Sequence, residues 1–187
     1  MRQRLISTAT ALLTDAGVEA VTLRGIAKAA GVSHGAPLRH FAGRAELLSV
    51  VATRGFTQLL ERGSQLPDGT PRERLTAACH AYVDFALSNP AMFELMFRRD
   101  LTDPEEPGLV SASSIVFDFF ATLVHEDREV AKDERLREGT DSRLVAASLW
   151  AALHGLAQLW LWGGLAGASF APSPESALAV TLDAYLG

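Results

Sequence analysis

Cysteine is almost absent from this chain of 187 residues, which contains only Cys79. One thiol excludes a disulfide framework within the chain and a zinc site built from several cysteines. Chains without structural disulfides are typical of the cytoplasm, so the composition predicts a cytoplasmic protein. The residues after Met1 also lack the continuous apolar stretch of a signal peptide, because Thr8, Thr10 and Asp15 interrupt it.

Catalytic and cofactor motifs are missing from residues 70–187. This part contains no GxSxG sequence, no phosphate-binding glycine loop and no HExxH motif, since the nearest match, HEDRE at 125–129, ends in glutamate. Cys79, His80 and Asp84 lie within about one helical turn, but pairs of this kind seldom bind metal without further ligands. The sequence therefore predicts no catalytic residue, no metal site, no cofactor and no enzymatic activity.

Alternation of apolar and polar residues, the pattern of a strand, stands out nowhere, whereas helical periodicity is found along nearly the whole chain. The sequence therefore predicts an all-α fold of about nine helices, with a three-helix N-terminal unit and a larger C-terminal bundle. The expected helices cover roughly residues 5–16, 22–30, 33–41, 44–62, 70–87, 91–97, 110–126, 142–162 and 174–186, with a charged helix end and loop at 125–141.

Positive charge is concentrated in the N-terminal part, although the net charge of the chain is −5. Residues 1–54 contain seven Lys and Arg against three Asp and Glu, which leaves ten against nineteen in the rest of the chain. A basic segment attached to an acidic remainder indicates that the segment contacts a polyanion and the remainder does not. Chance clustering is the alternative until a motif is identified.

The basic segment contains TLRGIAKAAGVSHGAPLRHF at 22–41, which has the pattern of two helices joined at a glycine. Thr22 is an N-cap, and Gly31 supplies the positive φ that a tight corner between two helices requires. Val32 fills the angle between the helices. The spacing directs Leu23, Ile26, Ala27, Ala30, Ala36, Pro37, His40 and Phe41 inward and leaves Ser33, His34, Gly35, Leu38 and Arg39 facing outward.

This outward face is suited to the major groove of duplex DNA. Its small residues allow close approach, and Arg39 can bond a phosphate or the O6 and N7 atoms of guanine. Thr22 with the first N–H groups of its helix can hold a phosphate, and the basic side chains replace counterions along the DNA. The candidate DNA-binding residues are Thr22, Arg24, Lys28, Ser33, His34, Gly35, Leu38, Arg39, His40 and Arg44.

The sequence TLRGIAKAAGVSHGAPLRHFAGRAELL closely resembles the DNA-binding segment of TetR-family transcriptional regulators, and LLTDAGVEAVTLRGIA extends the resemblance over residues 1–54. The resemblance implies a helix-turn-helix repressor that forms a homodimer and carries a ligand-binding C-terminal part. The family usually has a phosphate-contacting tyrosine where this chain has Leu38, which can contact a thymine methyl or a sugar instead. We therefore expect a DNA-binding domain at 1–46 and a ligand-binding and dimerisation domain at 47–187.

Aromatic side chains cluster in the C-terminal part, where some can line an apolar pocket between helices. His154 and Gln158 lie one turn apart on an apolar helix, so they are either bonded core polar groups or ligand contacts. NPAMFELMFRRDL and LWAALHGLAQLWLWGGL resemble the C-terminal type of TetR regulator named for a Trp-His-Gly motif, although Leu153 precedes His154 here. The candidate ligand-binding residues are Tyr82, Phe85, Phe93, Phe97, Phe117, Trp150, His154 and Gln158.

Residues 144–174 contain no Asp, Glu, Lys or Arg, and a membrane span needs about 20 apolar residues. Ser148, His154, Gln158 and the lack of flanking basic clusters argue against a span. We expect instead a helix at a dimer interface, packed with the last helix in a four-helix bundle between two subunits.

The sequence thus predicts a DNA-binding transcriptional regulator, a ligand-responsive repressor that binds a palindromic operator as a homodimer. Its expected partners are the double-stranded DNA operator, an apolar small-molecule effector and a second copy of the chain bound through the last two helices, with no membrane. The alternatives are a helical small-molecule-binding or enzymatic module with a vestigial DNA-binding unit, a helix pair used for protein contact, and a membrane-anchored regulator.

Overall fold

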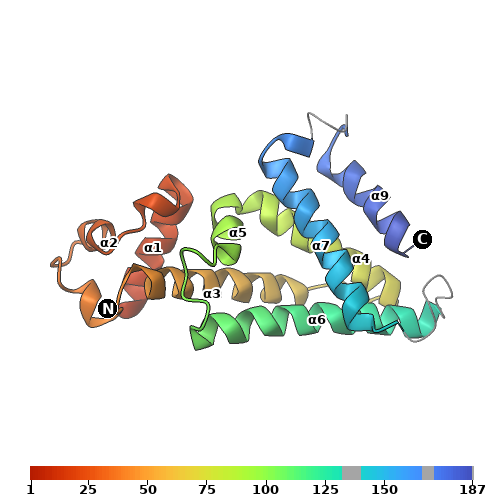
Figure 1. Ribbon diagram of the computed structural model, residues 1–187, viewed down its shortest axis with the longest axis horizontal. Coiled ribbons are helices and arrows are strands. Elements are labelled where there is room, and N and C mark those ends of the chain that lie inside the picture. Colours follow the sequence, from red (N-terminus) through yellow and green to blue (C-terminus); the bar gives the residue numbers. More distant parts are fainter. Residues whose placement is uncertain (132–139, 166–170, 187) are drawn as a thin grey trace. The chain divides into compact units, whose positions relative to one another are not determined.

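The computed structural model describes residues 1–131, 140–165 and 171–186, and these form eight α-helices and two short 3₁₀ helices without a strand (Figure 1). The predicted all-α fold is therefore confirmed. The α-helices are α1 (Arg2–Ala16), α2 (Leu23–Ala29), α3 (Arg44–Gly63), α4 (Pro71–Ser88), α5 (Pro90–Phe97), α6 (Pro107–Ala131), α7 (Ser142–Leu161) and α9 (Pro174–Leu186), and the 3₁₀ helices are η1 (Val18–Ala20) and η2 (Pro37–Arg39).

Several helices begin at the capping residues that the sequence contains. At the start of α4, Thr70 N donates to Glu73 Oε2 at 2.8 Å and Glu73 N donates to Thr70 Oγ1 at 3.3 Å, which forms a capping box. Pro90 is the first residue of α5, where its missing N–H costs no helical hydrogen bond. At the start of α9, Ser176 N donates to Ser173 Oγ at 3.2 Å.

The predicted third helix, at 33–41, is wrong, because this segment is a turn that contains only the short helix η2. Pro37 lacks the N–H that would bond the carbonyl of Ser33 in an α-helix. Bonds over three residues close the turn instead, from Ala36 N to Ser33 O at 2.9 Å and from Arg39 N to Ala36 O at 3.2 Å. The segment expected to meet DNA is therefore a compact turn, called the recognition turn below.

Helix α6 extends beyond both ends of the predicted 110–126. Arg72 Nε donates to Asp127 Oδ1 at 2.6 Å and Arg74 Nη1 donates to Glu126 Oε2 at 2.9 Å, so α4 neutralises two carboxylates on the last turns of α6. These pairs stabilise α6 at the point where it enters the charged sequence. Residues 132–139 of the predicted charged loop lie outside the described residues.

The chain packs into two compact units, Met1–Gln58 with Asn89–Ser114 and Leu59–Ser88 with Ile115–Gly187. Helices α3 and α6 contribute residues to both units. The predicted domains, 1–46 and 47–187, divide the chain by function rather than by packing and stay a prediction.

The first unit has an apolar core to which each of its helices contributes. Helix α1 contacts both α2 and α5, so these two helices pack on the same helix. Each completely buried Leu, Ile or Phe side chain stabilises the fold by roughly 1.5–3 kcal/mol. The fully buried side chains of this core include Leu5, Leu13, Ile26, Leu47 and Phe93.

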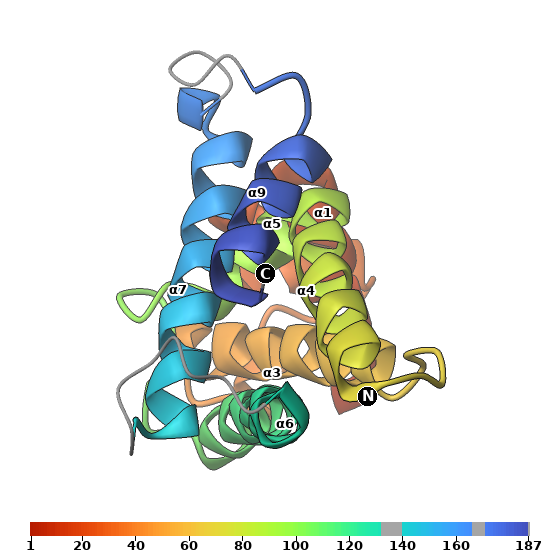
Figure 2. The same cartoon turned by 90° about the vertical axis from the view of Figure 1, so that its right-hand side faces the viewer.

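In the second unit, helices α4, α7 and α9 contact one another (Figure 2). Tyr185 Oη on α9 donates to the Ser148 carbonyl on α7 at 3.2 Å. The three helices share one apolar core, with Leu75 and Cys79 from α4, Leu149 and Leu153 from α7, and Leu178 from α9.

Candidate functional site: a nucleic-acid interface and an aromatic cluster

Helix α2 begins with the predicted N-cap, Thr22, whose Oγ1 accepts a hydrogen bond from Gly25 N at 2.9 Å. Only glycine fits at position 25, because an added Cβ would lie 2.9 Å from Ala20 O and 3.0 Å from Thr22 Oγ1. The backbone before α2 therefore folds closely over its first turn. Thr22 is exposed, and its hydroxyl proton is available to a phosphate oxygen.

The corner after α2 has the predicted conformation, with a φ of 65° at Gly31. Val32 N donates to Ala27 O at 3.0 Å, which closes the corner. Arg4 Nη2 on α1 donates to Ala30 O at 2.5 Å. The corner is thus attached to α1 by a charged donor.

The recognition turn is anchored by its inward side chains. Pro37 and Phe41 are buried, and Ala36 and His40 are half-buried, as their spacing predicts. The guanidinium of Arg2 lies over the Phe41 ring, 5.1 Å from its centre. The other side of the turn is exposed.

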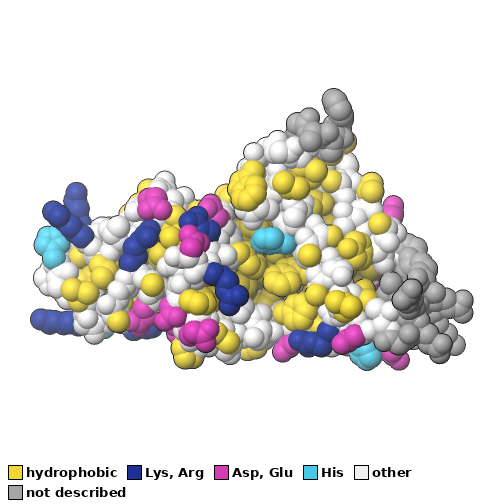
Figure 3. Space-filling view, in the orientation of Figure 1, with side chains coloured by type: hydrophobic (Ala, Val, Ile, Leu, Met, Phe, Trp, Pro, Cys, Tyr) yellow, Lys and Arg dark blue, Asp and Glu magenta, His cyan; other side chains and the backbone are white. Residues whose placement is uncertain are grey.

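Most of the candidate DNA-binding residues lie on this exposed surface of α2 and the recognition turn. The sequence from 20 to 45 contains no Asp or Glu, and Lys, Arg and His side chains gather over α2 and the adjoining turn in Figure 3. Such a surface presents positive charge to a phosphate backbone. The exposed candidates are Thr22, Arg24, Lys28, Ser33, His34, Gly35, Leu38 and Arg39, whereas His40 and Arg44 are half-buried.

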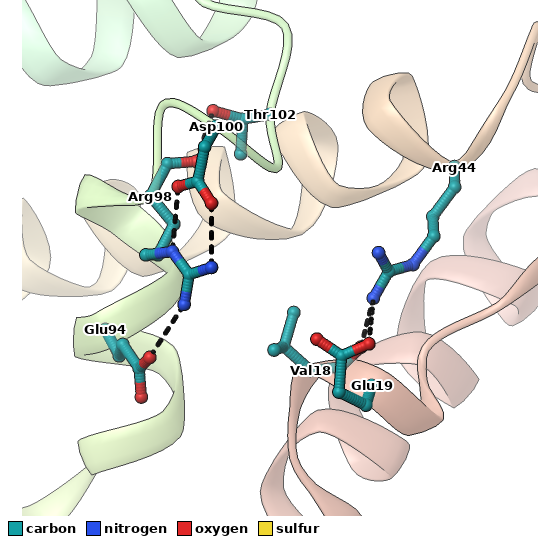
Figure 4. Close-up of polar contacts among 7 residues, drawn as sticks. All are labelled: Val18, Glu19, Arg44, Glu94, Arg98, Asp100 and Thr102. Atoms are coloured by element: carbon teal, nitrogen blue, oxygen red, sulfur yellow. Dashed lines mark hydrogen bonds and ion pairs between the residues drawn. The ribbon is translucent and has the colours of Figure 1, made fainter.

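Arg44 has intramolecular partners that the sequence did not indicate (Figure 4). Its Nη2 donates to Val18 O at 2.7 Å, with Glu19 Oε2 3.6 Å away. Its Nε donates to Val21 O at 2.8 Å. Arg44 is the first residue of α3, so it connects α3 to the segment that precedes α2. A DNA contact by Arg44 stays a prediction.

Arg98 forms a second charged cluster in the first unit (Figure 4). Its guanidinium donates to Glu94 at 3.0 Å and to Asp100 at 2.7 Å. The pair of Glu94 and Arg98 has the spacing of a helix ion pair, a signal that sequence reasoning did not use. A small hollow of about 50 Å³ lies between this cluster and the end of α1 at Gly17. It is far smaller than a ligand pocket, which usually measures about 300–1,000 Å³.

Four of the eight candidate ligand-binding residues come together in the second unit. Trp150 Nε1 donates to Tyr82 Oη at 2.9 Å, and Tyr82 Oη lies 2.9 Å from His154 Nδ1. The rings of Phe117 and Trp150 have their centres 5.7 Å apart. We call Tyr82, Phe117, Trp150 and His154 the aromatic cluster.

Burial sets the protonation states in this unit. It raises the pKa of the Tyr82 hydroxyl and lowers the pKa of His154, so His154 is neutral at pH 7. Tyr82 Oη and Nδ1 of the neutral His154 share one hydrogen bond, and its donor depends on which ring nitrogen of His154 carries the proton. Burial also raises the pKa of the Cys79 thiol to about 12, which leaves it without thiolate character.

The remaining candidate ligand-binding residues lie elsewhere. Phe93 and Phe97 belong to the first unit, where the Phe97 ring contacts Phe93 at 5.3 Å and Phe56 at 5.7 Å between ring centres. Phe85 is fully buried beneath Arg62, and Gln158 is half-buried on α7. Their roles in ligand binding stay predictions.

Helix α7 has an apolar side that the second unit leaves exposed. Leu144, Leu159 and Trp162 are 64%, 45% and 70% exposed, and hydrophobic side chains gather along α7 in Figure 3. Ser148 and Ala151 are exposed and Gly155 is half-exposed between these large side chains. The six residues recur at intervals of three and four, so they form one continuous stripe, called the α7 stripe below.

Two described helices, α6 at 107–130 and α7, are long and apolar enough to cross a membrane by length and composition. The exposed side of α6 carries Asp118, His125 and Glu129, which suits water. Residues 166–170 of the uncharged stretch lie outside the described residues.

Comparison with protein families gives two matches along the chain. A family described as bacterial regulatory proteins of the tetR family matches residues 5–51, and a family described as the tetracyclin repressor-like C-terminal domain matches residues 75–185. Together they cover both the helix-turn-helix and the helices of the aromatic cluster.

Individual proteins are similar over much of the chain. The transcriptional activator FasR of Mycolicibacterium smegmatis is 29% identical over 86% of this chain and 72% of its own length, and the transcriptional repressor KstR of Rhodococcus jostii is 30% identical over 52% of this chain and 46% of its own. The solved structure of a protein with unknown function from Rhodococcus sp. RHA1 is 33% identical, with a TM-score of 0.80 over 99% of this chain and 93% of that one. The TetR-family regulator PfmR of Thermus thermophilus, at 20% identity and a TM-score of 0.67 over 98% and 97%, shares the fold.

Proposed function

Because the chain belongs to the TetR family of DNA-binding transcriptional regulators, we propose that it is a homodimeric, ligand-responsive repressor that binds a palindromic operator. Each subunit places its recognition turn in a major groove, and the half-sites lie about 34 Å apart or somewhat more. We place this activity in the cytoplasm, without a membrane.

The observation that carries the proposal is the exposed basic surface of α2 and the recognition turn. Arg24 and Lys28 are exposed on α2 and serve as phosphate contacts, which set affinity. Arg39 is exposed at the end of η2, where it bonds a guanine edge or a phosphate. Gly35 and Ser33 allow the backbone to approach the bases closely.

The α7 stripe supports the homodimer. Small residues in its middle, Ser148, Ala151 and Gly155, let a second helix approach closely, and the large apolar residues at its ends pack around the crossing. The α7 stripes of two subunits can pack against each other about a two-fold axis, because each presents the same residues to the other. This symmetry matches that of a palindromic operator. Helix α9 contacts α7 and exposes Val180, so it adds a second helix from each subunit.

The aromatic cluster supports an apolar effector in the second unit. Its rings provide apolar contact area, and the hydrogen bonds among Tyr82, Trp150 and His154 fix its polar groups in place. We expect the effector to bind more tightly to a dimer conformation in which the distance between the two recognition turns does not match the half-site spacing. The dimer then dissociates from the operator. By linkage, bound DNA then weakens effector binding by the same factor.

DNA binding is tested by selection from a randomised duplex pool with the full-length protein at physiological salt. The proposal predicts enrichment of a palindromic site, and two chains per site in sedimentation of the complex. Arg39→Ala is expected to reduce affinity for that site while sedimentation still shows a dimer. No enrichment over random duplex favours the alternative of a vestigial DNA-binding unit.

The direction of regulation needs its own assay, because FasR is named an activator and KstR a repressor. Transcription in vitro from a promoter that contains the selected site is expected to fall when the protein is added. An increase in transcript would contradict the repressor proposal and leave DNA binding intact.

A further inference from the structure

We infer that Leu38 recognises the 5-methyl group of a thymine in each half-site, so that an apolar contact contributes to sequence specificity beside Arg39. The inference rests on the proposed function, since it requires the recognition turn to lie in the major groove.

The position of Leu38 is the first observation. Its side chain is 61% exposed in the middle of η2, although its chain neighbour Pro37 is buried. The other exposed residues of this surface are charged, polar or small, so Leu38 is the large apolar side chain among the candidates for DNA contact. Contact with DNA would remove this side chain from water.

The rigidity of the turn is the second observation. Pro37 fixes its own φ, and its carbonyl accepts hydrogen bonds from His40 N at 2.9 Å and Phe41 N at 3.0 Å. Phe41 is buried beneath the turn, with Arg2 over its ring. Leu38 is therefore presented by a backbone that is fixed on both sides, as specific recognition requires.

The chemistry of the groove then identifies the contact. A leucine side chain has no hydrogen-bond donor or acceptor, so it can form no hydrogen bond with a phosphate or a base edge. The thymine methyl is the apolar group that base edges display in the major groove. The deoxyribose is the other apolar surface of DNA, but contact with a sugar does not depend on the base.

Replacement of thymine by deoxyuridine tests the inference, because it removes the methyl and keeps the base pair. Each thymine of the selected half-site is replaced in turn, and affinity for the full-length protein is measured. At one thymine position per half-site, the replacement is expected to reduce affinity roughly fourfold, which corresponds to the free energy of burying one methyl group. Replacing both symmetric thymines is expected to reduce it roughly tenfold or more.

Protein variants then attribute the methyl contact. In Leu38→Ala the ratio of thymine to uracil affinities is expected to fall towards one, whereas Leu38→Met retains it. Arg39→Ala is expected to lose affinity and keep the ratio. Val110→Ala, which changes another exposed apolar residue of the first unit, is the matched control and should alter neither quantity.

Three results would overturn the inference. The first is that no thymine responds in the wild type. The second is that the response persists in Leu38→Ala, which assigns the methyl to another residue. The third is that Leu38→Ala lowers affinity by the same factor for the thymine and uracil sites and leaves their ratio at the wild-type value, which indicates that Leu38 itself contacts a sugar. Failure of the selection itself would refute the proposed function instead, so the two failures are distinguishable.

Discussion

Replacing Arg44 is expected to loosen the helix-turn-helix by an amount that can be derived from its contacts. Arg44→Ala removes two hydrogen bonds from a charged donor, to Val18 O at 2.7 Å and to Val21 O at 2.8 Å. Hydrogen bonds to charged groups contribute about 1.5–3 kcal/mol each, and the Arg44 side chain is 32% exposed, which reduces this value. We therefore expect the free energy of unfolding to fall by about 2–3 kcal/mol.

Two further variants separate these bonds from the ion pair. Arg44→Lys offers one compact ammonium, which reaches one carbonyl at most, so it should lose about half as much stability. Glu19→Gln should cost less than about 0.5 kcal/mol, because Glu19 is 85% exposed and lies 3.6 Å from the guanidinium.

Thermal unfolding followed by circular dichroism measures these differences. For a chain of this size, a loss of 2–3 kcal/mol lowers Tm by about 4–12 °C. A Tm of Arg44→Ala within 1 °C of the wild type would refute the reasoning, as would an equal loss in Glu19→Gln. The salt dependence of operator binding tests separately whether Arg44 contacts DNA. If Arg44 binds a phosphate, the slope of log affinity against log salt concentration should fall by about one in Arg44→Ala.

Three more predictions follow from glycine spacing and burial. Gly155→Leu is expected to yield a monomer in sedimentation, because the larger side chain prevents close approach of a second α7 helix. Helical circular dichroism should be unchanged, because an added Cβ meets nothing within 4 Å in the subunit and glycine is a poor helix former. A persistent dimer would refute the α7 interface. Gly25→Ala should lower stability by roughly 1–3 kcal/mol, since its Cβ would lie 2.9 Å from a backbone oxygen, whereas Gly35→Ala has open space; equal denaturant midpoints would contradict this. Burial lowers the pKa of His154, so on acidification the unfolded chain takes up a proton on His154 at a higher pH than the folded protein does. The free energy of unfolding should therefore fall as pH drops below about 6.5. His154→Gln should lose this decrease, and an unchanged pH profile in the variant would show that His154 is not its cause.

The helices that the sequence predicted well are those with local signals. The Thr22 cap, the glycine corner at Gly31 and the capping box of Thr70 and Glu73 each depend on residues within four positions, and all three are present. The helix predicted at 33–41 is wrong because the prediction relied on apolar spacing and gave too little weight to Pro37, which lacks the N–H that an α-helix needs there.

Contacts between distant residues could not be predicted from spacing. Arg44 bonds carbonyls 23 and 26 positions away, and Arg72 bonds Asp127 across 55 positions. Six of the eight candidate ligand residues were chosen because they are aromatic, and that criterion does not reveal that Phe93 and Phe97 belong to a different compact unit. Composition identified the kind of side chain, and packing determined which of them meet.

The buried thiol of α4 has a practical consequence. Cys79 is completely inaccessible, and its pKa is raised to about 12, so alkylating reagents and oxidants find almost no thiolate in the folded protein. Because the chain has one cysteine, each labelled molecule reports a single event, the opening of the second unit around α4. The rate of iodoacetamide labelling therefore measures local opening without any engineered probe.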